Sequence, residues 1–158
     1  MTDHTLKNNP VSIPHSVWPT DWVRQAEKTA AADQGLSLYT LMERAGQAAF
    51  DVAQQAYPDS RHWLVACGGG NNGGDGYVVA RLAKASGRQV TLVTQGNQSA
   101  LPEEARQAQA DWLAAGGDIQ VESGYWPADV DLIIDGLLGT GLNSAPREPG
   151  AALITQAN

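Results

Sequence analysis

One segment of this sequence holds glycine, asparagine and aspartate at a density that an ordinary connection does not have. Residues 68–76 read Gly-Gly-Gly-Asn-Asn-Gly-Gly-Asp-Gly and directly follow the apolar run 62–67, His-Trp-Leu-Val-Ala-Cys. A short apolar run that ends in glycines is typical of a buried strand. A plain connection from a strand to a helix needs only about 2–6 residues and few glycines. We therefore predict a buried strand, a ligand-binding loop over 68–76 and a helix over about 74–86.

The predicted loop would lie beyond the carboxyl end of a strand, where open α/β sheets bind their ligands. Glycine lets a ligand approach the main chain, and the N-terminus of the following helix offers N–H groups to an anion. Gly68, Gly70 and Gly73 fit the spacing G-x-G-x-x-G, but no carboxylate follows the next strand until Glu103, where an ordinary NAD-binding fold needs one for the ribose. The absence of a Gly-Lys-Ser/Thr triplet excludes a P-loop. The asparagine and aspartate oxygens suit hydroxyl groups or a hard cation.

Helical and strand patterns alternate along the remaining chain. Strands separated by helices of about a dozen residues imply right-handed βαβ units and a mostly parallel sheet. We predict an α/β fold, a Rossmann-like three-layer α/β/α sandwich in which two leading helices cover one face. The further predicted strands are 89–94, 118–121 and 130–135. The further predicted helices are 20–33, a stretch capped by Ser37 with apolar positions Leu38, Leu41, Met42, Ala45, Ala48, Ala49 and Val52, a helix from Pro102 to about Gly116, and one from Glu148.

Composition narrows the class of protein. Apolar residues make up 42% and charged residues 17%, which indicates a globular chain. Ten Lys and Arg against 17 Asp and Glu give a net charge of −7, which disfavours a nucleic-acid surface. The single Cys67 excludes an intrachain disulfide, and no apolar run approaches the ~20 residues that span a membrane. The polar N-terminus lacks the apolar core of a secretory signal, so we expect a cytoplasmic protein without nucleic-acid or membrane partners.

A second glycine-rich turn follows the strongest late strand. Residues 135–141 read Asp-Gly-Leu-Leu-Gly-Thr-Gly. Because the carboxyl ends of parallel strands meet at one edge, Asp135 would face the same edge as the first loop. Alone, Asp135 fits a turn-stabilising carboxylate as well as a functional one, and the neighbouring first loop favours the functional role. Leu137 and Leu138 are expected to pack.

The two loops resemble the signature loops of the NAD(P)HX epimerase family, the YjeF N-terminal domain. The resemblance rests on residues 70–76 and 135–141 and on Leu-Met-Glu-Arg-Ala-Gly at 41–46, and it extends from about residue 15 onward. It implies a Rossmann-like domain, commonly a homodimer, that interconverts the R and S hydrates of NADH and NADPH. These substrates, NADHX and NADPHX, carry water added at C6 of the nicotinamide ring. A fused or partner ADP- or ATP-dependent NAD(P)HX dehydratase is also implied.

The resemblance assigns roles to residues of both loops. It implies a bound potassium ion with Asn72 and Asp135 as ligands. Inverting the stereocentre requires loss and return of the hydroxyl group or opening of the ring, so proton transfer must be assisted. Asp135 is our candidate catalytic acid/base, with a purely positioning role left open. The residues expected to bind substrate are Asn71, Asn72, Gly73, Gly74 and Asp75, and, around the phosphates, Gly139, Thr140, Gly141, Leu142, Asn143, Ser144 and Ala145.

The end of the sequence departs from the family pattern. A further strand that ends in an Asp-Ile-Pro-Ser-Gly-like segment normally supplies another nucleotide-contacting acid and another cation ligand, and nothing after Asp135 matches it. We therefore interpret 1–19 as an irregular arm and 20–158 as an epimerase-like domain that is incomplete at its C-terminus. Such a site should bind more weakly, and its sheet should expose an unpaired edge.

Two other functions fit part of the sequence. A non-catalytic nucleotide-binding or dimerisation module of the same fold is favoured by the missing segment. A conventional NAD-dependent oxidoreductase is disfavoured because the ribose-binding acid is absent. The histidines (His4, His15 and His62) show no metal-ligand spacing, and Cys67 is expected to be a small core residue. Trp18 and Trp22 are candidates for a dimer contact, and the other tryptophans are expected to pack.

Overall fold

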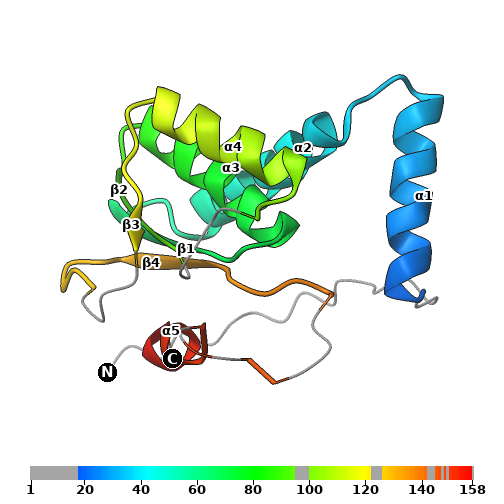
Figure 1. Cartoon of the computed structure of the whole chain (residues 1–158). Helices are drawn as coiled ribbons and strands as arrows, with labels where there is room; N and C mark the ends of the chain where they lie inside the picture. The colour runs from blue at the N-terminus through cyan, green and yellow to red at the C-terminus, as the bar shows by residue number, and fades with distance from the viewer. Residues whose placement is uncertain are drawn as a thin grey trace.

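A computed structural model describes residues 18–94, 100–121, 126–141, 145–146, 148 and 150–157. In these residues helices and strands alternate, as Figure 1 shows. The helices are α1 (Thr20–Asp33), α2 (Leu38–Ala56), α3 (Asn71–Ala85), α4 (Glu103–Ala114) and α5 (Gly150–Ala157). The strands are β1 (His62–Cys67), β2 (Gln89–Thr94), β3 (Gln120–Val121) and β4 (Leu132–Gly136).

The strands form one parallel sheet in the order β3-β2-β1-β4. Helices α2, α3 and α4 lie on one face and α5 lies on the other (Figure 1). All six residues of β1 are buried because its neighbours and both helical layers cover it. Val65 and Cys67 pack toward α3 and α4, while Leu64 and Ala66 pack with Leu153 of α5. The predicted three-layer α/β/α sandwich is confirmed, and double-sided burial explains why β1 reads as a continuous apolar run.

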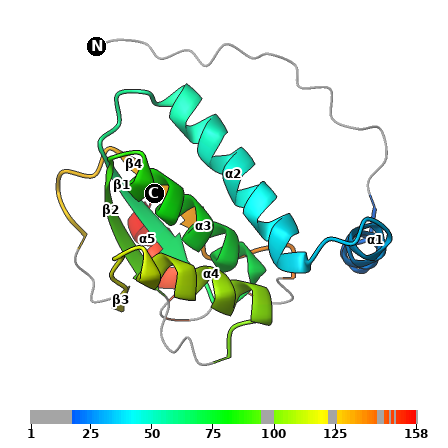
Figure 2. The same ribbon diagram turned by 90° about the horizontal axis from the view of Figure 1, so that it is seen from above.

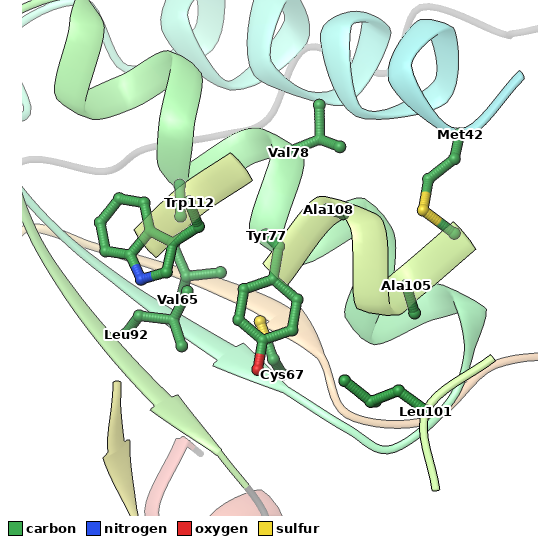
Figure 3. Packing of buried hydrophobic residues seen from close by; sticks show 11 residues of the cluster. Met42, Val65, Cys67, Tyr77, Val78, Leu92, Leu101, Ala105, Ala108 and Trp112 are labelled. Carbon is green, nitrogen blue, oxygen red and sulfur yellow. The ribbon is translucent and has the colours of Figure 1, made fainter. Parts of the chain in front are cut away.

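The three helices of the upper layer approach one another closely at small residues. Figure 3 shows the buried cluster between them and the sheet, in which Tyr77 and Trp112 are the largest side chains. A Cβ atom built on Gly46 of α2 would lie 2.5 Å from Cγ1 of Val78 of α3. Any larger residue at position 46 would therefore push α2 away from α3.

The predicted apolar face of α2 is only partly right. The helix buries Met42, Gly46, Phe50 and Ala53, a stripe centred on the close approach at Gly46. The exposed members of the predicted set are Ala45, Ala48, Ala49 and Val52. Because alanine has little apolar surface, the alanines of α2 do not decide which face is buried. The close contact of Gly46 with α3 decides it.

Helix α1 lies apart from the layers (Figure 2), and Ala31 is its one buried residue. The expectation that both leading helices cover the sheet is wrong for α1, because α2, α3 and α4 already occupy that face. The rings of Trp18 and Trp22 stack with centroids 4.4 Å apart, and both side chains are about half exposed (54% and 52%). The other tryptophans pack as predicted: Trp63 and Trp112 are buried and Trp126 is partly buried. The predicted arm lies outside the described residues up to position 17.

His62 and Cys67, the first and last residues of β1, are the remaining reactive side chains considered in the sequence. Nε2 of His62 lies 2.9 Å from Oγ1 of Thr91, and its Nδ1 lies 3.2 Å from Oδ1 of Asp129. Cys67 is fully buried, and burial raises the pKa of its thiol. Both are therefore structural, as expected; His4 and His15 lie outside the described residues. None of the described helices combines the length and apolarity that crossing a membrane requires.

Candidate functional site

The first glycine-rich segment is mostly the start of a helix. Helix α3 begins at Asn71, three residues before the predicted start at Gly74, and Gly70 is its N-cap with an extended backbone. The N–H of Gly74 donates to the carbonyl oxygen of Gly70 at 3.2 Å. The N–H groups of residues 71–73 precede the first intrahelical bond and are thus available to a ligand at the carboxyl edge of the sheet.

The glycines inside α3 serve packing as well as ligand approach. A Cβ atom on Gly73 would lie 2.1 Å from the carbonyl oxygen of Gly68. One on Gly74 would lie 2.5 Å from Cε of Met42 and 3.0 Å from Cα of Ala105. Both glycines are buried, so they bring the first turn of α3 against the end of β1 and against α4.

The second loop continues β4 along the same edge. The N–H of Gly68 donates to the carbonyl oxygen of Gly136 at 3.0 Å, which ties the ends of β1 and β4 together. Oδ1 of Asp135 accepts a hydrogen bond from the N–H of Leu137 at 2.9 Å. The Asp135 side chain is exposed, so its carboxylate both supports the turn and is accessible to a ligand. Leu137 is buried and Leu138 is half-buried, as predicted.

Asn72 joins the two loops. Its Nδ2 donates to the carbonyl oxygen of Leu138 at 2.9 Å. A Cβ atom on Gly136 would lie 3.0 Å from the backbone oxygen of Asn72, and one on Gly139 would lie 3.3 Å from Cβ of Asn72. The sequence placed both loops at one edge, and the structure brings them into direct contact there. With its amide nitrogen bound to Leu138, Asn72 has its amide oxygen left as a side-chain acceptor.

The donor set at this edge fits a hard monovalent cation chemically. Asn72 contributes an amide oxygen and Asp135 a carboxylate oxygen, the ligand atoms that hard cations prefer. In the part of the chain that the structure describes, no group of three or more His, Cys, Asp and Glu side chains is arranged to hold a metal ion. A cation held here would therefore also need amide, backbone or water oxygens.

Asp75 is the titratable group of the first loop. Its side chain is half-buried in α3, and burial raises its pKa to about 6, with a smaller contribution from the negative charge of Glu27. A carboxyl group with this pKa exchanges its proton near neutral pH, which an acid/base in a reaction requires. The sequence predicted Asp75 as a substrate contact but not the shift in its pKa, because the shift comes chiefly from burial in the folded chain and, to a smaller extent, from Glu27, which lies 48 positions earlier.

The remaining predicted residues lie on the turn after β4. Gly139, Thr140 and Gly141 are exposed at this edge, and Ala145 is exposed farther along the chain. Leu142, Asn143 and Ser144 lie outside the described residues. A side chain that sequence reasoning missed lies against this turn: a Cβ atom on Gly141 would lie 2.5 Å from Nη2 of Arg24 in α1. Only the fold of the chain brings the two together, so the sequence pattern held no signal for this contact.

Comparison with known proteins gives a consistent result. A family model described as YjeF-related protein N-terminus matches residues 38–158. The chain is 62% identical over 158 residues to the bifunctional NAD(P)H-hydrate repair enzyme Nnr of Escherichia coli (strain K12), covering 100% of this chain and 31% of that protein. It is 38% identical over 130 residues to an NAD(P)H-hydrate epimerase of Rhodobacter capsulatus, covering 78% of this chain and 61% of that protein.

A solved structure supports the fold. The crystal structure of yeast ynu0, YNL200c, superposes with a TM-score of 0.76 at 23% identity, covering 89% of this chain and 64% of that chain. At this identity the likeness concerns the fold alone. The chain spans about a third of the length of the bifunctional Escherichia coli relative.

Proposed function

This chain belongs to the family of YjeF-related protein N-terminal domains, and on that premise we propose that it is an NAD(P)H-hydrate epimerase domain. The proposed reaction interconverts the R and S forms of NADHX and NADPHX as part of nicotinamide nucleotide repair. The observation that carries the proposal is the union of two glycine-rich loops at one sheet edge through the bond between Asn72 and Leu138. The names of the Escherichia coli and Rhodobacter capsulatus relatives support the same reaction.

In this proposal the substrate lies across both loops. The N–H groups of residues 71–73, at the positive end of α3, interact with the nucleotide, and Asp75 borders the same turn. The segment 139–145 holds the phosphates, and the glycines at 139 and 141 allow a close approach to its main chain.

Asp135 is the proposed acid/base. Breaking and re-forming the C–O bond at C6 requires a proton on the departing oxygen and removal of a proton from the returning water. The exposed carboxylate of Asp135 is held in a fixed turn by its bond from Leu137, so its position is defined before substrate binds. Asp75, with a pKa of about 6, is a second carboxyl group able to exchange a proton beside the same loop.

A potassium ion is the proposed cofactor, with Asn72 and Asp135 among its ligands. The ion would supply a positive charge that orients the substrate hydroxyl group. We further propose a homodimer and, in the longer protein, a dehydratase that consumes the S hydrate. The word bifunctional in the names of relatives about three times as long supports that arrangement.

The alternative is a non-catalytic nucleotide-binding or dimerisation module of the same fold. The exposed, stacked pair of Trp18, which precedes α1, and Trp22, in its first turn, favours the module, because large exposed aromatic side chains often mark an interface. Such a module would bind nucleotides or its own copies without altering the ratio of the two hydrate epimers.

The direct test adds this chain to purified R-NADHX and measures the rate at which the S form appears, once in potassium buffer and once in sodium buffer. The account predicts a rate above the spontaneous one and faster in potassium. A rate equal to the spontaneous one in both buffers would contradict the epimerase function and favour the module.

Asp135→Asn tests the acid/base assignment. Asparagine retains an oxygen that can accept the hydrogen bond from Leu137, so the turn should persist while proton transfer is lost. We expect kcat to fall by about 10²–10⁴, the usual contribution of a general acid/base. Asp118→Asn is the matched control: it removes an exposed carboxylate away from both loops and should retain the wild-type rate. Full activity in Asp135→Asn would overturn the assignment.

A further inference from the structure

The proposed phosphate-binding edge has an excess of negative charge in the described residues. Asp75 and Asp135 belong to the two loops, and Glu27 is near enough for its charge to affect Asp75. The chain as a whole carries −7. A nucleotide pyrophosphate would add further negative charge, so backbone N–H groups alone would have to offset the repulsion unless a basic side chain lies close by.

Arg24 is in the right place for this role. A Cβ atom built on Gly141 would lie 2.5 Å from Nη2 of Arg24 and 3.7 Å from its Cζ, so the guanidinium group rests against the second loop. Figure 1 shows the segment after β4 running toward the foot of α1. A side chain at position 141 would occupy the place of the guanidinium group, so glycine there gives Arg24 access to the turn.

The guanidinium group of Arg24 is only loosely engaged elsewhere. Its Nη1 lies 3.8 Å from Oδ1 of Asp21, one turn earlier on α1, and the two side chains are 55% and 99% exposed. An exposed pair at that distance contributes little stability and gives way readily to a better anion. Arginine has five N–H donors in a planar fork that matches two phosphate oxygens, and within the described part of the chain Asp21 is the one side chain that pairs with Arg24.

Other basic side chains with described contacts are engaged away from the loops. Arg81 forms an ion pair with Glu43 at 3.1 Å. Arg88 lies over the ring of Trp63 at 4.8 Å. Arg24, by contrast, lies directly against Gly141 of the proposed phosphate turn.

The position of Glu27 gives independent support. Glu27 follows Arg24 by three residues and therefore projects from the same side of α1. Its charge acts on Asp75 in the first loop, while Arg24 lies against Gly141 in the second. One face of α1 thus lies along both loops. Ala31 is the one residue of this helix that is buried.

We propose that Arg24 binds the pyrophosphate of the nucleotide at the second loop, so that α1 forms one wall of the substrate site. This inference rests on the proposed function and extends it to a residue outside the segment that the family model matches. Arg24 would make a charge-assisted, two-pronged contact to phosphate oxygens. Its role is binding, and it takes no part in proton transfer at C6.

The test compares Arg24→Gln with Lys84→Gln, which removes an equal charge from an exposed position in the last turn of α3, far from both loops. Calorimetric titration with ADP-ribose, which carries a pyrophosphate, is run beside titration with adenosine, which carries none. We expect Arg24→Gln to weaken ADP-ribose binding about tenfold and to leave adenosine binding unchanged, while Lys84→Gln stays within about twofold of wild type. Arg24→Lys should restore part of the loss because it retains the charge without the fork.

The KM of NADHX should rise about tenfold in Arg24→Gln with little change in kcat. Unchanged ADP-ribose affinity and KM in this variant, with a wild-type chain that epimerises NADHX, would overturn the role of Arg24 alone. Equal loss of ADP-ribose and adenosine binding would also overturn it, because that result indicates a disturbed structure. A wild-type chain that neither binds ADP-ribose nor epimerises NADHX would overturn the proposed function and this inference together.

Discussion

The folded structure affects three polar side chains at the carboxyl edge of the sheet in different ways. The amide nitrogen of Asn72 donates to the carbonyl oxygen of Leu138, and one carboxylate oxygen of Asp135 accepts from the N–H of Leu137. Both side chains are therefore held in place by hydrogen bonds to the main chain. Asp75 is half-buried, and its pKa is raised by burial and by Glu27. The fold therefore positions the first two and destabilises the charge of the third.

Asp75→Asn should stabilise the protein at neutral pH. The pKa of Asp75 is about 6 in the folded state against its ordinary value of 3.8, so the folded chain holds this proton more tightly than the unfolded chain does. The resulting stability is fully present below pH about 4 and is lost as the pH rises through about 6. We expect the variant to gain about 1 kcal/mol in free energy of unfolding at pH 7.5, after allowance for partial solvation. Urea denaturation measures this gain.

The gain should shrink as the pH falls from 7.5 toward 4.5, because the wild-type side chain becomes protonated in the folded state. Asp118→Asn, at an exposed position, is the control and should change the free energy of unfolding by no more than about 0.5 kcal/mol. A variant less stable than wild type at pH 7.5 would mean that the ionised carboxylate makes a favourable contact in the folded state, contrary to this account.

The residues of the site could be predicted from sequence to different extents. Asp135 lies at the end of β4 and Asn72 comes soon after β1, so the rule that ligands bind at the carboxyl edge was enough to predict that both lie there. Arg24 could not be found this way, because its role depends on where α1 lies against a turn more than 100 positions later. The raised pKa of Asp75 could not be predicted either, because it depends first on burial of the side chain in the folded chain and second on the charge of Glu27 in α1.

Helix α3 begins earlier than its glycines suggest. Glycine is a poor helix former, so sequence reasoning assigned residues 71–73 to a loop. In the structure α3 begins at Asn71, and a Cβ atom on Gly73, Gly74 or Gly76 in its first turns would clash with Gly68, with Met42 and Ala105, or with Cys67. Tertiary packing thus overrides the local propensity, and the same glycines that pack the helix leave its N-terminus open to a ligand.

Gly73→Ala and Gly69→Ala separate packing from flexibility. A Cβ atom at position 73 would lie 2.1 Å from the carbonyl oxygen of Gly68, whereas one at position 69 would meet nothing within 4 Å. We expect Gly73→Ala to lower the free energy of unfolding by about 1–3 kcal/mol through forced movement of the backbone. Gly69→Ala should change it by no more than about 0.5 kcal/mol. Chemical denaturation of the two variants measures the difference.

Equal stabilities for the two alanine variants would show that the turn has room at position 73 and that the close approach does not fix the start of α3. Equal large losses would instead indicate that the segment needs glycine for backbone freedom at both positions. Either result would contradict the packing role assigned to Gly73.

The sheet and its layers followed from sequence because strands and helices alternate and β1 is apolar throughout. The placement of α1 did not follow, since its pattern resembles a covering helix while the face it would cover is filled by α2, α3 and α4. Whether a helix covers the core or lines a site depends on space that other elements leave. In this molecule α1 contacts α2, and its Arg24 also lies against Gly141 of the second loop, which makes α1 part of the proposed site.

The central claim is that both loops form one site for a hydrated nicotinamide nucleotide. A titration of the isotope-labelled chain with NADHX, followed through backbone amide signals, tests it most directly. The account predicts concerted shifts, with one dissociation constant, at residues 70–73 and 136–141, and none at Arg61 and Asp131 on the opposite edge. Shifts confined to one loop, or gathered at the opposite edge, would contradict a single site built from the two loops.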